Sequence, residues 1–337
     1  MASDFCKKLP KIELHAHLNG SLSVATIAKL VRLHMKNYPD EAVPAASEMF
    51  CDPKNFDDGY AIFKCAQALV DHPEAVKVAT TNVLSEFAQE NVKYIELRST
   101  PRSCPGKMTK LEYLTKIVEA IDEQSDILAK LLVSIDRRKS VEEAKENLDL
   151  ALEVQKKNPN CLVGIDLSGD ARVNDLRDYV EVLKQAQNHG MKVSLHLAEV
   201  DNQEEIGFIL DHPDFKPDRV GHCTFVHPQN GGSETTWKKF CLWDVPSEIC
   251  LTSNIKCKSV ESYSNHHLRS FYGENLKLCI CTDDKGAFSC SSSEEHTRAM
   301  DLLKITEDEM FSLSLKAVDY IFADEYTKDA IRSLFVA

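Results

Sequence analysis

The 337-residue sequence has no long apolar segment and no long run of positive charge. No stretch approaches the ~18 uninterrupted apolar residues that a membrane helix needs, and the N-terminal MASDFCKKLP lacks the apolar core of a signal peptide. The formal net charge is −13, and basic residues cluster only in short pairs such as Arg137-Arg138. We therefore expect a cytosolic protein that binds neither a membrane nor a nucleic acid.

Two further absences narrow the class of protein. No G-x-G-x-x-G follows the first predicted strand, which argues against a doubly wound dinucleotide-binding sheet. The 12 cysteines are scattered and follow no export signal, so we expect reduced thiols. What is present is ordinary globular composition, 43% hydrophobic and 28% charged, which is enough apolar material for one large core.

Eight short apolar runs recur along the chain, and each stops at polar residues. They are IELHAHL, VKYIELRST, LLVSIDRR, LVGIDLSG, KVSLHLAE, RVGHCTF, EICLTSN and KLCICTDD. We place their ends at His17, Thr100, Asp136, Ser168, Glu199, His222, Asn254 and Asp284. The first interval is 83 residues and the others are 23 to 36, which mostly fits a strand, a helix and two loops.

Helical patterns fill the intervals. SVEEAKENLDLALEVQKK opens with Ser140 and Glu143 in capping-box spacing, and NDLRDYVEVLKQAQNHG runs from a predicted cap at Asn174 to Gly190. Eight strand and helix units predict one (β/α)₈ barrel domain over residues 1–337. Because 83 residues are too many for one crossover, we expect a helical insertion over the strand-end rim at about 21–91. TEDEMFSLSLKAVDYIFA predicts extra C-terminal helices.

The first strand carries two histidines one residue apart. His15 and His17 point the same way, because side chains alternate along a strand. In a barrel they would meet His196 and Asp283 at one rim, giving three imidazoles and one carboxylate that suit a catalytic divalent metal such as Zn²⁺, one per chain. Glu199 would lie beside it as a proton carrier.

Each piece also has an ordinary structural interpretation. An isolated H-x-H can be two surface histidines on an edge strand, His222 alone can be a core histidine, and Asp283-Asp284 can be a turn. Their joint presence at the ends of four predicted barrel strands favours the metal site.

The order of the motifs resembles a known family. HAHLNGS, IDLSGD, SLHLAE, RVGH and CTDD are similar to the motif series of the adenosine deaminase family. HLNGS, ELRSTP, SIDRR and CLTSN most resemble its adenosine-deaminase-like branch, the N6-methyl-AMP deaminases. The H-x-E and P-C-x-x-C signature of cytidine deaminases is absent.

The resemblance implies a role for each matching residue. It implies zinc binding by His15, His17, His196 and Asp283, protonation of purine N1 by Glu199, orientation of the attacking hydroxide by His222, a bond from Asp284 to N7, and a bond from the Gly169 N–H to N3. The implied reaction is hydrolytic removal of methylamine from N6-methyl-AMP to give IMP. One alternative is an adenosine or AMP deaminase. The other is a barrel that binds purine without turnover, and this alternative predicts that one or more of the metal ligands are missing.

Fewer sequence features indicate which residues would contact the sugar and the phosphate of the substrate. Asn19 stands where nucleoside deaminases carry an aspartate, so it removes a repulsion toward a 5′-phosphate, or it only shapes an N-G turn. Arg98, Ser99 and Thr100 offer a guanidinium and hydroxyls for a phosphate, although a lone arginine at a strand end is usually a surface salt bridge. By resemblance, RSTP (Arg98, Ser99, Thr100 and Pro101) and Asp136 line the nucleotide site with His17. Gln67 departs from the histidine common in this branch. We expect a monomer.

Overall fold

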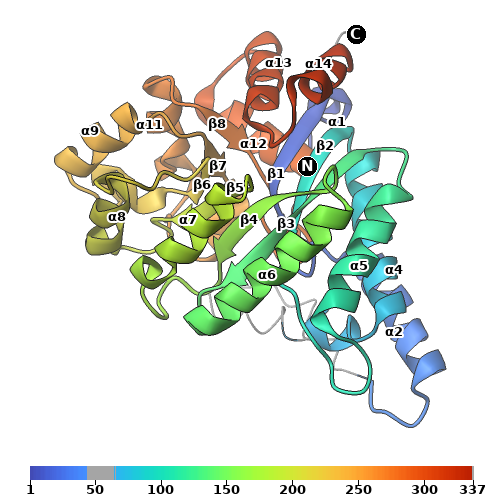
Figure 1. Ribbon diagram of the computed structural model, residues 1–337. Coiled ribbons are helices and arrows are strands. Elements are labelled where there is room, and N and C mark those ends of the chain that lie inside the picture. The colour runs from blue at the N-terminus through green and yellow to red at the C-terminus, as the bar shows by residue number, and fades with distance from the viewer. Residues whose placement is uncertain (44–63, 65, 336–337) are drawn as a thin grey trace.

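The computed structural model describes residues 1–43, 64 and 66–335, and its centre is an eight-stranded parallel sheet in sequential order. A bridge between Ala16 and Asp283 joins the last strand to the first. The Asp283 N–H donates to the His15 carbonyl at 2.7 Å, and the His17 N–H donates to the Asp283 carbonyl at 3.1 Å. The predicted (β/α)₈ barrel is confirmed (Figure 1).

The strands match the eight predicted runs except at their ends. They are β1 (Lys11–His17), β2 (Val92–Ser99), β3 (Leu128–Asp136), β4 (Leu162–Ser168), β5 (Lys192–Leu197), β6 (Arg219–His222), β7 (Ser247–Ile249) and β8 (Leu278–Ile280). Nearly every strand residue is buried, because one face fills the barrel and the other packs against helices.

The end of the seventh run was predicted wrongly. EICLTSN predicts a strand ending at Asn254, but the chain turns after Ile249 and forms helix α10 (Leu251–Lys256). Glu295 accepts hydrogen bonds from the Thr252 N–H at 2.9 Å and from its hydroxyl. This long-range contact holds the first turn of α10, and no local pattern in the sequence predicts the contact.

The helices pack outside the strands (Figure 1). They are α1 (Asp4–Lys8), α2 (Val24–Asn37), α4 (Pro73–Gln89), α5 (Lys110–Asp122), α6 (Val141–Lys157), α7 (Val180–Asn188), α8 (Gln203–Leu210), α9 (Glu234–Trp243), α10, α11 (Leu268–Gly273), α12 (Ser292–Leu303), α13 (Glu307–Lys316) and α14 (Glu325–Ser333). None of the helices in the described ranges is long and apolar enough to span a membrane.

Helix caps test the predicted boundaries. Ser140 Oγ accepts from the Glu143 N–H at 3.3 Å at the start of α6, and Thr306 with Glu309 forms a full capping box at α13. The predicted cap Asn174 is wrong. Its side chain instead donates to the Arg137 carbonyl at 2.6 Å, tying the loop to the neighbouring strand, while the next residue caps the short 3₁₀ turn before α7.

The long first interval contains two described helices. Helix α4 packs against α5 and β2 and therefore occupies the ordinary crossover position between the first two strands, whereas α2 extends beyond the barrel (Figure 1). Residues 44–63 and 65 lie outside the described residues, so the insertion over the rim at about 21–91 stays a prediction.

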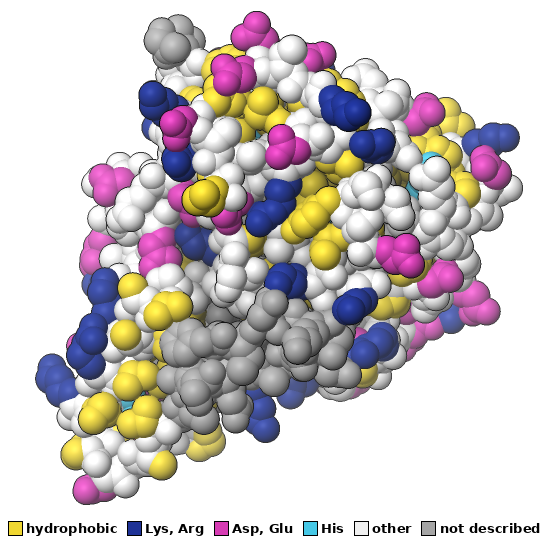
Figure 2. Space-filling view, turned by 180° about the vertical axis from the view of Figure 1, so that it is seen from behind, with side chains coloured by type: hydrophobic (Ala, Val, Ile, Leu, Met, Phe, Trp, Pro, Cys, Tyr) yellow, Lys and Arg dark blue, Asp and Glu magenta, His cyan; other side chains and the backbone are white. Residues whose placement is uncertain are grey.

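The C-terminal helices close the end of the barrel where the strands begin. Ser314 on α13 donates to the Pro10 carbonyl at 2.7 Å, and Arg219 donates to the Tyr320 carbonyl at 2.9 Å. On the face shown in Figure 2, acidic and basic side chains are interspersed, and apart from the grey atoms no continuous basic patch covers it. The candidate site lies at the other end of the barrel, where the strands end.

Candidate active site

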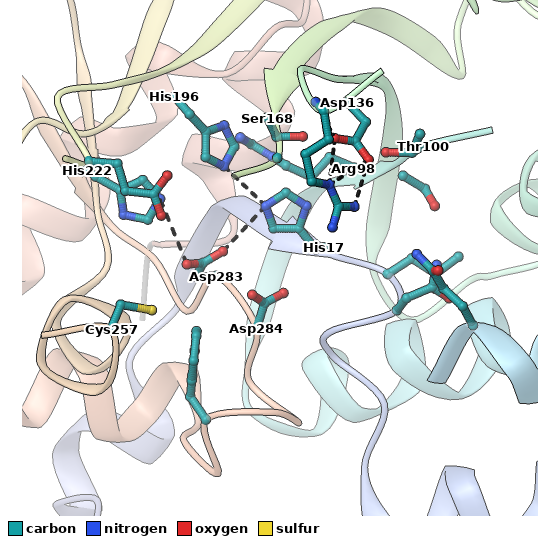
Figure 3. Close-up of a pocket in the computed structure, with 18 residues that line it drawn as sticks. His17, Arg98, Thr100, Asp136, Ser168, His196, His222, Cys257, Asp283 and Asp284 are labelled. Carbon is teal, nitrogen blue, oxygen red and sulfur yellow. Dashed lines mark hydrogen bonds and ion pairs between the residues drawn. The ribbon is translucent and has the colours of Figure 1, made fainter. Parts of the chain in front are cut away.

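Four side chains predicted to bind a metal lie together at the rim. His15 and His17 come from β1, His196 from β5 and Asp283 from the segment after β8, and one ligand atom from each lies within 4.8 Å of the others. Figure 3 shows three of them, His17, His196 and Asp283, turned toward one another. Asp283 Oδ1 lies 3.3 Å from His15 Nε2 and 3.4 Å from His17 Nε2. His17 Nε2 is 3.3 Å from His196 Nε2.

Neighbouring acids orient two of these rings. Glu248 accepts from His15 Nδ1 at 2.7 Å, and Asp166 lies 3.1 Å from His196 Nδ1, so each imidazole keeps Nε2 as its ligand atom. Within the described residues His15 Nε2 makes no hydrogen bond although it is buried. Burial lowers the pKa of His17 to about 3, which keeps its lone pair available. The donor set therefore fits a divalent metal such as zinc.

Two candidate proton-transfer residues lie beside the cluster. His222 Nε2, at the end of β6, is 3.7 Å from Glu199 Oε1 and 3.9 Å from Asp283 Oδ2. Burial raises the pKa of Glu199 to about 7, so this carboxyl can hold or release a proton near neutrality. Burial, and then the charge of Asp283, raises the pKa of Asp284 well above its ordinary value, which favours a protonated carboxyl that can donate a hydrogen bond.

The backbone at this rim is strained. Ala198, His222, Cys223 and Asp283 all have φ between 55° and 63°. Non-glycine residues seldom adopt this left-handed conformation, which costs about 1–3 kcal/mol each. The strained residues lie at or next to the strand ends that carry Glu199, His222 and Asp283. Strained backbone is often found where side chains are held in a particular orientation at a functional site.

The pocket continues away from the metal cluster. Most of the other predicted substrate residues line it, namely Asn19, Arg98, Ser99, Thr100, Asp136, Gly169 and Asp284. Gln67 also lines it, whereas Pro101 is not among the lining residues. Asn19 Nδ2 donates to the Tyr113 hydroxyl at 3.3 Å, which in turn lies 2.6 Å from Ser99 Oγ. Gly169 has φ +98°, and a Cβ there would overlap the Asp136 carboxylate, so only glycine brings its N–H to this position.

Comparison with known proteins decides the family. The family model described as Adenosine deaminase matches residues 10–337. The chain belongs to the adenosine deaminase family. It is 38% identical to the N6-methyl-AMP deaminase of Danio rerio, over 97% of this chain and 94% of the relative. The crystal structure of Arabidopsis N6-mAMP deaminase has a TM-score of 0.90 at 34% identity and covers 99% of both chains.

A further solved structure, of Arabidopsis ADAL complexed with IMP, has a TM-score of 0.89 at 34% identity and covers 99% of this chain and 98% of that chain. As a member of the adenosine deaminase family, the protein is a hydrolytic purine deaminase. Its fold and the convergence of its predicted ligands agree with that membership.

A buried charge network surrounds the candidate metal ligands of this deaminase. Glu248 accepts from His15, from Arg98 at 2.8 Å, from Arg219 at 2.7 Å and from Ser194 at 2.9 Å. Buried charges are tolerated when they are paired and hydrogen-bonded, and here each one has several partners. Glu248, Arg219 and Asp166 are not among the residues predicted from the sequence. Their signal is a charged residue inside an apolar strand, as in SEI, RVG and IDL.

The structure does not support the predicted phosphate contact of Arg98. Its side chain is fully buried, and its guanidinium donates to Asp166 at 2.9 Å as well as to Glu248. The arginine with access to solvent in this pocket is Arg138, whose side chain is 39% exposed and pairs with Asp136 at 2.7 Å. Other lining residues that the sequence analysis missed are Leu18, Ser168, Cys257 and Phe288.

Proposed function

We propose that this protein hydrolyses N6-methyl-AMP to IMP and methylamine with one zinc ion per chain. The observation that carries the proposal is the intact convergence of three imidazoles and one carboxylate beside Glu199 and His222. Support comes from relatives named N6-methyl-AMP deaminase and from a similar structure whose title names IMP, the product of this reaction.

The chemistry divides between the metal and the chain's own residues. Zinc held by His15, His17, His196 and Asp283 would supply an activated water as the nucleophile. Glu199 delivers its proton to purine N1, which makes C6 electrophilic, and His222 holds the attacking oxygen by a hydrogen bond. The oxygen bonds to C6, its remaining proton passes to the exocyclic nitrogen, and the bond from C6 to that nitrogen breaks, so that methylamine leaves and the oxygen stays as the C6 carbonyl of IMP.

The rest of the pocket holds the nucleotide. Asp284 faces N7 and the Gly169 N–H faces N3, which fixes the purine plane relative to the metal. Asn19, Ser99 and Thr100 lie toward the sugar and phosphate. Because Asn19 is neutral, it avoids the repulsion that a carboxylate would exert on a 5′-phosphate.

Two other functions remain to be compared. An adenosine or AMP deaminase would use the same chemistry at C6, and Asn19 is the residue that argues against a simple nucleoside substrate. A barrel that binds purine without turnover has no need of an intact site, yet all four candidate ligands and Glu199 are present and convergent.

The decisive experiment compares four substrates with one enzyme preparation. We expect kcat/KM to be highest for N6-methyl-AMP, ahead of AMP, N6-methyladenosine and adenosine. A preference for adenosine would contradict the nucleotide proposal while leaving the deaminase chemistry in place. Size-exclusion chromatography with light scattering tests the expected monomer.

Metal analysis tests the cofactor separately. We expect one zinc ion per chain, and removal by a chelator should abolish activity and lower the melting temperature together, because ligand binding favours the folded state. Re-addition of zinc should restore both. Metal content below about half an equivalent in active protein would contradict the site.

A further inference from the structure

A chain of hydrogen bonds leads from the start of α11 to His222. The Leu268 N–H donates to His266 Nδ1 at 3.1 Å, His266 Nε2 lies 3.1 Å from Asn254 Oδ1, and Asn254 Nδ2 lies 3.4 Å from His222 Nδ1. All four residues are buried. Asn254 lies on α10, His266 in the loop before α11, Leu268 on α11 and His222 at the end of β6, and of these only His222 belongs to the predicted site.

The direction of this chain follows from its first member. A backbone N–H can only donate, so His266 Nδ1 accepts and the proton of the neutral ring is on Nε2. Nε2–H then requires an acceptor, which orients the Asn254 amide with Oδ1 toward His266. Nδ2 therefore faces His222, and His222 Nδ1 must accept.

A second contact fixes the same amide orientation. Ser259 Oγ donates its single proton to the Asn254 carbonyl at 3.2 Å, so toward the side chain it can only accept, and it lies 3.3 Å from Asn254 Nδ2. Amide orientations are normally assigned from such networks. Here two independent anchors, a backbone N–H and a hydroxyl, require the same one.

We propose that Asn254 and His266 are positioning residues that fix His222 in the tautomer with its proton on Nε2. His222 Nε2 points into the site, 3.7 Å from Glu199, and within the described residues it makes no hydrogen bond. The carbonyl of His222 is held as well, because His267 Nε2 donates to it at 2.8 Å. Both the ring and its backbone are therefore fixed.

This tautomer decides what His222 does in the reaction. An Nε2–H can donate to the attacking oxygen but cannot remove its proton, so proton transfer falls to Glu199. The inference about the tautomer stands on the contacts alone, whereas its catalytic meaning rests on the proposed function. The hydrogen bonds from Asn254 and His267 hold the ring and the carbonyl of His222, so its orientation does not depend on a bound metal.

Nitrogen NMR of histidine-labelled, zinc-loaded protein without substrate tests the tautomer directly. The His222 signals are assigned by their loss in His222→Gln. We expect Nε2 to be protonated and Nδ1 bare. In Asn254→Asp an acceptor replaces the donor, so we expect the proton at Nδ1 and kcat lower by about 10–100-fold, the usual effect of an outer partner, with KM little changed.

Asn147→Asp is the matched control, since Asn147 is buried on α6 and contacts Lys110 away from the pocket. It should leave the His222 signals and kcat unchanged. A protonated Nδ1 in the unsubstituted protein would overturn the proposal, and this spectrum decides the matter even if no Asn254 variant folds. An unchanged tautomer in Asn254→Asp would also overturn it. Absence of N6-methyl-AMP turnover in the unsubstituted protein would instead contradict the proposed function. It would leave the tautomer inference intact, because the tautomer is measured without turnover.

Discussion

The two ends of the pocket are built differently. At the end that carries the candidate metal ligands, here called the metal end, His15, Arg98 and Glu248 are fully buried and each of the three has a buried partner. At the nucleotide end, Asn19 and Thr100 are partly exposed and Arg138 reaches solvent. Figure 3 shows His222 and Cys257 on one side of the pocket, with Thr100 and Asp136 on the other.

This difference follows the division of the chemistry. Attack at C6 needs groups held in one geometry, and a paired, buried network keeps them there because moving a single charge would leave another unpaired. Selection among substrates needs only a moderate difference in free energy at the far end. We therefore expect substitutions at the metal end to have large effects, and those at the nucleotide end to shift selectivity.

The largest effect should come from Glu199→Gln. Glutamine keeps the shape and much of the hydrogen bonding but carries no transferable proton, so kcat should fall at least ~100-fold while zinc content stays at one per chain. Steady-state kinetics with metal analysis measures both. Unchanged turnover would assign the proton transfer to another residue.

Arg98→Met should be nearly as severe, but through stability. It leaves Asp166 and Glu248 buried without one of their cations, which costs about 3–5 kcal/mol of unfolding free energy. Arg138→Met removes an exposed arginine from the same pocket and should cost at most ~1 kcal/mol. Chemical denaturation of both variants checks the contrast. A mild Arg98→Met with lost nucleotide preference would restore the predicted phosphate contact.

The sequence allowed the metal end to be predicted because its signals are local. His15 and His17 share a strand face by alternation, and Glu199, His222 and Asp283 follow apolar runs whose barrel arrangement brings their ends together. The same reasoning placed seven of the eight strand ends within a few residues. The metal cluster therefore needed no long-range information beyond the fold itself.

Two features depend on residues that are far away in the sequence. Arg98 follows a strand like the other site residues, but its destination depends on Glu248, 150 residues away, and Asp166, 68 residues away. Asn254 likewise lies in a helix whose first turn is held by Glu295. Which charged partner a side chain meets across a barrel cannot be derived from its neighbours in sequence.

At the nucleotide end, Asn19→Asp should reduce nucleotide use selectively. A carboxylate ~4 Å from a phosphate at an effective dielectric of about 20 costs on the order of 4 kcal/mol per unit charge. One third of that, after screening, is about tenfold. The measurement is the kcat/KM ratio of N6-methyl-AMP to N6-methyladenosine in both proteins, in which general damage cancels. An unchanged ratio would make Asn19 a turn residue.

Arg138→Met should have the smallest effect, because its guanidinium is partly exposed and already pairs with Asp136. Exposed ion pairs contribute up to ~1 kcal/mol, so the same substrate ratio should fall by at most about fivefold. Arg172→Met is the matched control, since Arg172 forms the same pair with an aspartate two residues earlier, at 2.8 Å, and is not among the residues that line the pocket. If only Arg138→Met lowers the ratio, this arginine replaces Arg98 as the cation that senses the phosphate. If neither variant does, the neutral donors Asn19, Ser99 and Thr100 carry phosphate recognition, and the difference between the two ends of the pocket becomes sharper still.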